Sequence, residues 1–486
     1  MIAASRTRPP PRAPSANAAL VPSPKVRVAA VAAAAVFLLG GGGPNYGAAL
    51  WSSGALFCGI AILWRRGEFP LLLFVFLMPW LQASTSIFYS NYLGIQLQNY
   101  SDYRGEMELA VILSLAGLVA MAIGMRLGAG KPAPALTRGA LAIASQRPLS
   151  QWFNIYLIAA VLSYSLTSVA WISPGLTQFI LAVENLKWAF FFMLGFAATA
   201  RGAFWSPYFV LPFLGEFMMA AGGFFSDFKT VFIVSILAVS AVSRPSNART
   251  TLGVALFASV LLILGTAWSS VKMDYRNFIS GGTGDQVVVV DYLTRVSKLA
   301  SMVSNLDGSA LSEGFDKLLH RFSYVEFFSA ELDYIPNIRP YQDGAITADA
   351  VLRPFMPRLL FPEKDAIDDT ERARQLTGIK LQQKRQTSVS VGYVGEFYAD
   401  FGVPAMFAAL LAVGWLYGRV FNWLINDRRF AGPFGMGLAC AVLMQVGALE
   451  NSFTKIFGGL VVSLLACWAI AHYVIRPYCP WVLLRP

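Results

Sequence analysis

The sequence is poor in the side chains that metal clusters and disulfide scaffolds need. It holds 4 cysteines and 2 histidines in 486 residues. Cys58, Cys440, Cys467 and Cys479 lie in or beside apolar runs, and no two of them form a CxxC pair. We therefore expect neither a disulfide nor a metal cluster, and we predict no cofactor.

Charge is also scarce, because charged residues make up 13% of the chain and hydrophobic residues 56%. A soluble globular protein carries roughly 25% charged residues, so this chain lacks the charge to cover a surface that faces water. The same composition excludes a disordered or collagen-like chain over most of the length. It predicts a polytopic membrane protein.

Apolar runs recur along the chain at lengths that suit membrane helices, since crossing a bilayer takes about 20 helical residues. We predict an all-α fold with about twelve transmembrane helices. The runs are 26–41, 45–64, 69–88, 107–126, 153–173, 178–199, 206–223, 228–243, 251–270, 403–424, 431–449 and 456–475. Within one of them, Glu184 and Lys187 are spaced to neutralise each other.

The net charge of +11 is spread unevenly. Segment 271–390 has similar numbers of acids and bases, so the excess positive charge lies in the tails and short loops. If the N-terminus is cytoplasmic, most Lys and Arg of the short loops fall on the cytoplasmic side, as the positive-inside rule requires. We therefore predict that both termini are cytoplasmic and that segment 271–390 lies outside. This pattern does not indicate a nucleic-acid partner.

Five regions follow from this topology. Residues 1–25 form a disordered tail, 26–270 hold spans one to nine, 271–390 form the outer segment, 391–475 hold the last three spans, and 476–486 form a second tail. Apolar residues at helical spacing predict that the outer segment is a mostly helical cap. The first apolar run, which ends in several glycines, also fits a signal-peptide core.

The cap segment concentrates cations beside a histidine. Arg321 follows His320, Arg353 and Arg358 belong to a proline-rich stretch, and Lys364 comes just after it. The prolines around Arg358 prevent a helix there. A guanidinium binds phosphate oxygens in a bidentate fork, while Lys supplies a point charge. The alternatives are that the arginines pair with neighbouring acids and that the histidine is structural.

Carboxylates follow the cap at the predicted outer boundary of the bilayer. Glu396 and Asp400 are four residues apart and share one face of a helix that enters a span. Carboxylates at that depth are costly unless they are solvated or paired with cations. Lys229 lies at the outer end of another hairpin, and Glu216 lies inside the preceding span. An alternative for Glu396 and Asp400 is that they only begin an interfacial helix.

Two stretches of the sequence are similar to those of a known family. They are MPRLLFPEK at 356–364 and GYVGEFYADFG at 392–402, the second at the mouth of a span. Together with the many spans and the single large outer loop, they resemble the bacterial oligosaccharide repeat-unit polymerases (O-antigen polymerase, Wzy-type). The resemblance implies a membrane glycosyltransferase of the GT-C type in the bacterial inner membrane, with the cap in the periplasm. Its substrates would be undecaprenyl-diphosphate-linked oligosaccharides, with a chain-length regulator and export machinery as further partners.

The resemblance also implies roles for these residues. Arg321, Arg353, Arg358, Lys364 and Lys229 would bind the diphosphate that leaves the donor. Glu396 would be the general base for the attacking sugar hydroxyl, with His320 and Asp400 as further catalytic candidates. The first outer loop, residues 42–46, lacks the acidic pair of many dolichol-dependent relatives, which favours a metal-independent transfer.

Other functions fit parts of the sequence. A ligase that moves glycan from the same carrier to another acceptor would share the donor chemistry. A transporter or flippase for the lipid-linked glycan predicts ionisable residues through the membrane midplane and internal symmetry, and no internal repeat is visible. A transpeptidase would need an outer cysteine nucleophile, which the cap segment lacks.

Overall fold

The computed structural model describes residues 23–131, 134–170, 177–223, 228–242, 248–283, 287–356, 361, 363–364, 367–380 and 389–484. Throughout these ranges the secondary structure is helical, with no β-strand. The prediction of an all-α chain is therefore confirmed. The predicted N-terminal tail lies almost wholly outside the described residues.

The helices before the predicted cap are mostly long and apolar. They are α1 (Pro24–Gly40), α2 (Tyr46–Leu63), α3 (Leu71–Leu93), α4 (Met107–Gly128), α5 (Pro134–Gln146), α6 (Leu149–Ala170), α7 (Thr177–Asn185), α8 (Lys187–Ala200), α9 (Pro207–Ala221), α10 (Lys229–Val242) and α11 (Ala248–Ile279).

The remaining helices comprise short ones in the cap segment and the C-terminal set. They are α12 (Tyr292–Ser304), α13 (Gly308–Phe322), α14 (Glu326–Tyr334), α15 (Ala345–Leu352), α16 (Asp369–Thr377), α17 (Gly392–Asn426), α18 (Pro433–Leu443), α19 (Phe453–Ile470) and α20 (Arg476–Tyr478). Short 3-10 turns lie at Leu97–Asn99, Arg353–Phe355, Met444–Val446 and Pro480–Val482, and Ala471–Ile475 is a π-helix.

Each of the twelve predicted apolar runs coincides with helix, but the described residues hold seven helices long and apolar enough to cross a membrane. These candidate spans are Tyr46–Leu63, Leu71–Leu93, Met107–Gly128, Leu149–Leu166, Ala255–Ile279, Gly392–Asn426 and Phe453–Tyr478. Three shorter apolar helices, α9, α10 and α18, accompany them. The run 178–199 is divided between α7 and α8, because a tight turn at Leu186 interrupts the helix.

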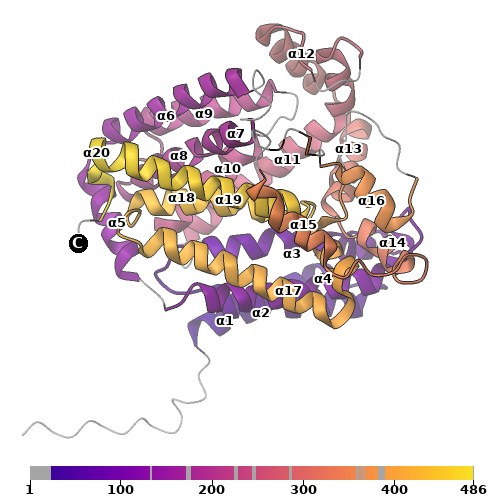
Figure 1. The fold of residues 1–486 in the computed structure, drawn as a ribbon. Helices are drawn as coiled ribbons and strands as arrows, with labels where there is room; N and C mark the ends of the chain where they lie inside the picture. The colour runs from indigo at the N-terminus through magenta and orange to yellow at the C-terminus, as the bar shows by residue number, and fades with distance from the viewer. Residues whose placement is uncertain are drawn as a thin grey trace, which may run out of the picture.

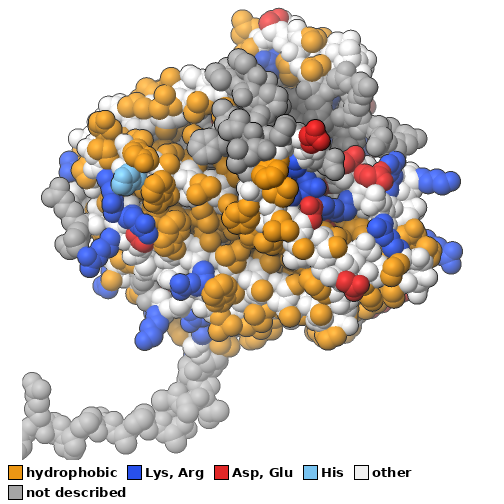
Figure 2. All heavy atoms as spheres, in the orientation of Figure 1, with side chains coloured by type: hydrophobic (Ala, Val, Ile, Leu, Met, Phe, Trp, Pro, Cys, Tyr) orange, Lys and Arg blue, Asp and Glu red, His pale blue; other side chains and the backbone are white. Residues whose placement is uncertain are grey.

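The helices lie side by side with their ends gathered at two opposite sides of the molecule (Figure 1). Helices α13, α14 and α16 lie at one end, and α5 and α20 lie at the other (Figure 1). Figure 2 shows hydrophobic side chains over the middle of this face. Lys and Arg gather at the α5–α20 end, and both acids and bases gather at the cap end (Figure 2).

The closest helix pairing joins α4 to α17 through glycines on both helices. A Cβ atom at Gly124 would lie 2.1 Å from the Leu411 carbonyl oxygen, and one at Gly418 would lie 2.2 Å from the Met125 carbonyl oxygen. Gly128 and Gly414 meet the facing backbone in the same way. The two helices thus present facing GxxxG motifs, which let backbones approach within a membrane.

Helix α17 changes direction at Gly402, where φ is 63° and ψ is −170°. This backbone conformation favours glycine, and Tyr341 packs so closely that a Cβ atom at Gly402 would lie 2.8 Å from its ring. The change of direction separates the first turns of α17, which contact the cap, from the apolar part that follows Pro404. The outer turns carry Glu396 and Asp400.

Aspartate side chains fix the starts of the cap helices. Asp291 accepts a hydrogen bond from the Thr294 amide at 2.9 Å, and Asp307 accepts one from the Ala310 amide at 2.7 Å. Asp368 does the same for α16, whose end is marked by Gly378 in the left-handed conformation. The predicted helical character of the cap segment is confirmed for its described residues, with α13 and α14 separated at Ser323.

Candidate functional site

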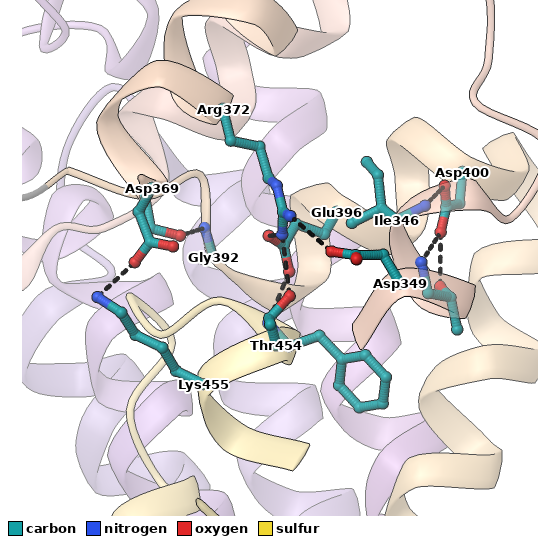
Figure 3. A network of polar contacts seen from close by, with 12 residues as sticks. Ile346, Asp349, Asp369, Arg372, Gly392, Glu396, Asp400, Thr454 and Lys455 are labelled. Atoms are coloured by element: carbon teal, nitrogen blue, oxygen red, sulfur yellow. Dashed lines mark hydrogen bonds and ion pairs between the residues drawn. The ribbon is translucent and has the colours of Figure 1, made fainter. Parts of the chain in front are cut away.

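A partly buried polar network, which we call the Arg372 network, joins the cap to the first turns of α17 and α19 (Figure 3). Its members are Asp349, Arg353, Arg372, Glu396 and Thr454. The Arg372 guanidinium donates to Glu396 Oε1 at 3.0 Å, to Thr454 Oγ1 at 3.0 Å and to Asp349 Oδ2 at 3.3 Å. One arginine from α16 therefore connects α15, α17 and α19.

The predicted base Glu396 has both carboxylate oxygens occupied. Oε1 pairs with Arg372, and Oε2 accepts a hydrogen bond from the Phe453 amide at 2.6 Å. The residue is 1% exposed. In this conformation a substrate hydroxyl cannot reach it. The geometry favours a positioning role, in which Glu396 fixes the Arg372 side chain.

Asp400, also predicted as catalytic, holds the start of α15 (Figure 3). Its carboxylate accepts hydrogen bonds from the Ile346 amide at 3.0 Å and from the Thr347 amide at 2.7 Å. It also accepts one from the Thr347 hydroxyl at 2.5 Å. A carboxylate at exposed helix amides is a capping arrangement, so the geometry assigns Asp400 a structural role instead.

Two of the predicted diphosphate ligands are brought together, but each one is engaged within the cap. Arg353 Nε donates to both oxygens of Asp349, at 2.9 and 2.7 Å. Lys364 Nζ donates to the carbonyl oxygens of Arg353 at 2.6 Å and of Met356 at 2.9 Å. These contacts hold Lys364 against the 3-10 turn at Arg353–Phe355. Arg358 lies outside the described residues.

Glu331 of α14 is a carboxyl group that sequence reasoning did not single out. It is fully buried, and among the described residues neither of its oxygens has a hydrogen-bond partner. It packs against α17 so closely that a Cβ atom at Gly395 would lie 2.3 Å from Glu331 Oε2. Burial raises its pKa well above 4.5, and the charges of Glu396 and Asp400 raise it further. Both effects favour the neutral form of Glu331.

His320, at the end of α13, faces a carboxylate. Its Nδ1 lies 3.5 Å from Glu326 Oε1, and its ring stacks on Tyr100 with centroids 4.7 Å apart. The hydrogen bond to Glu326 raises the His320 pKa above 6.5, against the opposing effect of partial burial. With Nδ1 turned toward Glu326, Nε2 is the nitrogen available to accept a proton. A carboxylate that orients an imidazole in this way serves general-base catalysis in other enzymes.

Three cations lie within range of one another's charge, and we call them the cation cluster: Lys272, Arg276 and Arg321, the last of which follows His320 in the chain. Lys272 and Arg276 are one turn apart on α11, and the positive charge of Arg321 acts on both. Arg276 is 4% exposed, Lys272 is half-buried and Arg321 is exposed. Cations gathered at one place favour the binding of an anion. Only Arg321 was predicted from sequence.

Close packing of α11 on α13 forms the cation cluster. A Cβ atom at Gly314 would lie 1.9 Å from Ser270 Oγ and 2.8 Å from the Thr266 carbonyl oxygen. The Ser270 hydroxyl donates to the Ala310 carbonyl at 2.9 Å. Leu318, in the last turn of α13, packs against Gly265 of α11. From that turn the charge of Arg321 acts on Lys272 and Arg276.

Tyr324 lies between the cation cluster and the acidic side of the cap. Its hydroxyl donates to the Ser390 carbonyl at 2.6 Å and accepts from the Ser390 amide at 3.0 Å. Burial raises its pKa, Glu450 and Asp369 raise it further, and the charge of Arg321 lowers it. The charges of Arg321 and Asp369 thus act on the same hydroxyl, in opposite directions. Asp369 itself pairs with Lys455 at 2.5 Å (Figure 3).

Two other predicted residues lie apart from this region. Lys229 is the exposed first residue of α10, and its neighbour Phe228 packs against α11. Its described contacts do not join it to Arg353 or Lys364. Glu216 is 3% exposed and pairs with Lys187 at 3.1 Å. The predicted pairing of Lys187 with Glu184 is wrong. Glu216 of α9 is distant in the sequence, but the fold places its carboxylate beside the Lys187 ammonium group.

Sequence reasoning missed Arg372, Lys272, Arg276, Glu326 and Glu331. Arg372 and Glu331 lie in amphipathic helices where charged residues are common, so the sequence held no signal for them. Lys272 and Arg276, by contrast, share a helix face at the end of a long apolar run, and that spacing is a usable signal. Among the described residues, no three His, Cys, Asp or Glu side chains lie together in a way that could hold a metal ion.

Comparisons with known proteins define the family. No curated protein and no solved structure matches the chain. One family, described as "Domain of unknown function (DUF8712)", matches residues 69–476. The match includes the α4–α17 pairing, the cation cluster and the Arg372 network. Because it extends over most of the sequence, the chain belongs to the DUF8712 family.

Proposed function

We propose that this protein is a membrane glycosyltransferase that joins oligosaccharides carried on undecaprenyl diphosphate into a longer polysaccharide. The observation that carries the proposal is the cation cluster beside the His320–Glu326 pair. A diphosphate headgroup needs several cations at one place, and a sugar hydroxyl needs a base to become a nucleophile. Arg321 and His320 are neighbours in the chain, and Lys272 and Arg276 end a helix long enough to cross a membrane, which supports the proposal.

The cation cluster suits an anion that leaves during the reaction. Lys272 and Arg276 project from the end of an apolar helix, so a prenyl chain would lie along the candidate span while its diphosphate meets the cations. Arg321 approaches from the cap and is exposed, which lets a ligand enter. Cations held in place before the reaction stabilise the charge that develops on the departing diphosphate.

His320 replaces Glu396 as the proposed base. In the transfer, His320 Nε2 takes the proton of an acceptor hydroxyl, whose oxygen then bonds to the anomeric carbon of the donor sugar. The bond from that carbon to the diphosphate oxygen breaks, and undecaprenyl diphosphate leaves with the bonding electron pair. Attack from the side opposite the leaving group inverts the anomeric centre. Glu326 keeps the imidazole oriented and stabilises its protonated form.

The orientation belongs to the same proposal. Twelve spans with both termini in the cytoplasm place the cap segment on the periplasmic side of a bacterial inner membrane. The Lys and Arg side chains at the α5–α20 end of the molecule support this orientation (Figure 2). Lipid-linked oligosaccharides would then meet the cation cluster from the outer leaflet.

The test is binding of undecaprenyl diphosphate to the purified protein in detergent, followed by turnover of a lipid-diphosphate oligosaccharide. The double variant Lys272→Gln, Arg321→Gln should lose at least tenfold in affinity and form no ladder of products. Lys317→Gln is the matched control, since Lys317 is an exposed cation of α13 that pairs with Glu313. Equal affinity in the double variant and the control would refute the proposed site.

A ligase uses the same donor site, so the product distinguishes it: a ladder indicates polymerisation and a single transfer indicates ligation. A transporter is favoured by a different observation, the buried Lys187–Glu216 pair inside the helical bundle. Movement of lipid-linked glycan across a vesicle membrane without any change in glycan length would support that function instead.

A further inference from the structure

An array of aromatic rings extends from His320 across the outer end of α3. His320 stacks on Tyr100, with ring planes 11° apart. Tyr89 meets both rings edge-on, at 6.2 Å from Tyr100 and 6.4 Å from His320. Tyr92 then stacks on Tyr89, with centroids 6.1 Å apart and planes at 13°. We call these four residues the aromatic array.

The two ends of the aromatic array face solvent, although its middle is buried. Tyr92 is 82% exposed, so the ring face that does not meet Tyr89 is open. The His320 side chain is 44% exposed. Tyr89 and Tyr100, between them, are buried. The array therefore has the exposed ring of Tyr92 at one end and the partly exposed proposed base, His320, at the other.

Carboxylates accompany the rings. The Tyr89 hydroxyl donates a hydrogen bond to Asp316. The charges of Asp102 and Asp316 act on His320, in addition to that of Glu326. Open aromatic faces beside carboxylates fit a sugar, because the C–H faces of a pyranose stack on aromatic rings and its hydroxyls donate to carboxylate oxygens. A lipid tail would use the rings and leave the carboxylates without a function.

The position of the aromatic array indicates which of the two glycans, donor or acceptor, it would bind. Arg321 of the cation cluster directly follows His320 in the chain, so the diphosphate site adjoins one end of the array. A donor glycan is covalently held at that end. The open ring of Tyr92 lies at the other end, beyond the base, where an incoming acceptor glycan must approach.

We propose that the aromatic array is the acceptor-glycan subsite, with Tyr92 as the residue on which a sugar ring stacks. This inference rests on the proposed function, because it takes His320 as the base toward which the acceptor hydroxyl points. The buried rings of Tyr89 and Tyr100 connect Tyr92 to His320 through ring contacts. The ligand class is an uncharged oligosaccharide, recognised without its lipid.

The experiment measures binding of three probes to the full-length protein in detergent. They are undecaprenyl diphosphate, the lipid-linked oligosaccharide extracted from the source cells, and the free oligosaccharide released from it by mild acid. Wild type should bind the free oligosaccharide. Tyr92→Ala should weaken that binding at least about fivefold, as the loss of one stacked ring predicts, and leave undecaprenyl diphosphate affinity unchanged. Tyr92→Phe, which keeps the ring, should bind as wild type does.

Tyr478→Ala is the matched control, because Tyr478 is 77% exposed and lies at the opposite end of the molecule. If both alanine variants lose thermal stability alike and neither loses affinity for oligosaccharide, Tyr92 is a membrane-interface residue and the inference is wrong. Failure of wild type to bind undecaprenyl diphosphate overturns the proposed function. If the free oligosaccharide still binds in a Tyr92-dependent way, the glycan subsite stands without that function.

Discussion

Arg372 of α16 and Glu396 of α17 form an ion pair with 3.0 Å between Nη1 and Oε1, and it joins the cap to the membrane helices (Figure 3). The carboxylate is 1% exposed and the guanidinium side chain 21%. Removing one partner of a buried pair leaves an uncompensated charge, at a cost of about 3–5 kcal/mol. This pair therefore determines how firmly the cap is held.

We predict that Arg372→Met lowers the melting temperature in detergent by several degrees, because Glu396 is left charged and buried. The double variant Arg372→Met, Glu396→Gln should recover much of the loss, since it removes both charges. Glu396→Gln alone should keep measurable turnover at a temperature where it is folded. A folded Glu396→Gln protein with no turnover would restore Glu396 as the base.

Glu331 gives a prediction on pH and stability. Its pKa is raised well above 4.5 in the folded protein, so the folded form keeps a proton that the unfolded form releases. That contribution to stability is complete below pH 4.5 and declines as the pH rises toward the folded pKa. Thermal unfolding of wild type should therefore become easier over that interval. Glu331→Gln, which is neutral at every pH, should remove this part of the dependence.

The matched comparison for Glu331 is Glu313→Gln, since Glu313 is an exposed carboxylate of the cap that pairs with Lys317. Its unfolding should follow the wild-type pH dependence. A Glu331→Gln protein whose melting temperature varies with pH just as wild type does would show that Glu331 is ionised in the folded state.

His320 gives a prediction on the pH dependence of transfer. The base must be neutral, so kcat/KM should fall as the pH drops below the His320 pKa, which Glu326 raises above 6.5. Glu326→Gln should move this acid limb to lower pH, because the neutral amide no longer favours the imidazolium. Asp102 and Asp316 also raise the pKa, so the shift should be partial. A limb that does not move in Glu326→Gln would exclude His320 as the base.

The positions of the helices could be predicted from the sequence, because apolar runs and aspartate caps are local signals. The pairing of α4 with α17 was predictable in principle from Gly124 and Gly128 facing Gly414 and Gly418, a spacing that occurs on both helices. The number of helices that cross a bilayer was harder to predict. A turn such as that at Leu186 does not interrupt the apolar run in the sequence, but it divides the run into two shorter helices.

The site was less predictable, because its partners are distant in the sequence. Arg321 and His320 were identified from the cap sequence alone, but the cations that complete the cluster come from α11. Arg353 was expected to bind phosphate, and instead Asp349, one helical turn away, occupies its guanidinium. The spacing of four residues between Asp349 and Arg353 can be read from the sequence. Whether Arg353 pairs with Asp349 or binds a ligand depends on the fold.

The Lys187–Glu216 pair gives the last prediction. Lys187 Nζ lies 3.1 Å from Glu216 Oε2, and the hydroxyls of Tyr156 and Tyr164 each donate to the Glu216 carboxylate at 2.8 Å. Both charged side chains are under 10% exposed. Lys187→Met should destabilise the protein by about 3–5 kcal/mol, because the carboxylate remains buried with only hydroxyl donors. The measurement is thermal unfolding in detergent.

The control for this pair is Glu184→Gln, which removes the carboxylate that sequence spacing assigns to Lys187. It should change the melting temperature little, whereas Glu216→Gln should lower it markedly. Adding Glu216→Gln to Lys187→Met should then cost less than the two single losses combined, because the second change neutralises the charge that the first one exposed. If Glu184→Gln proves the more damaging variant, then Lys187 pairs along its own helix and α9 is not held to α8 by charge.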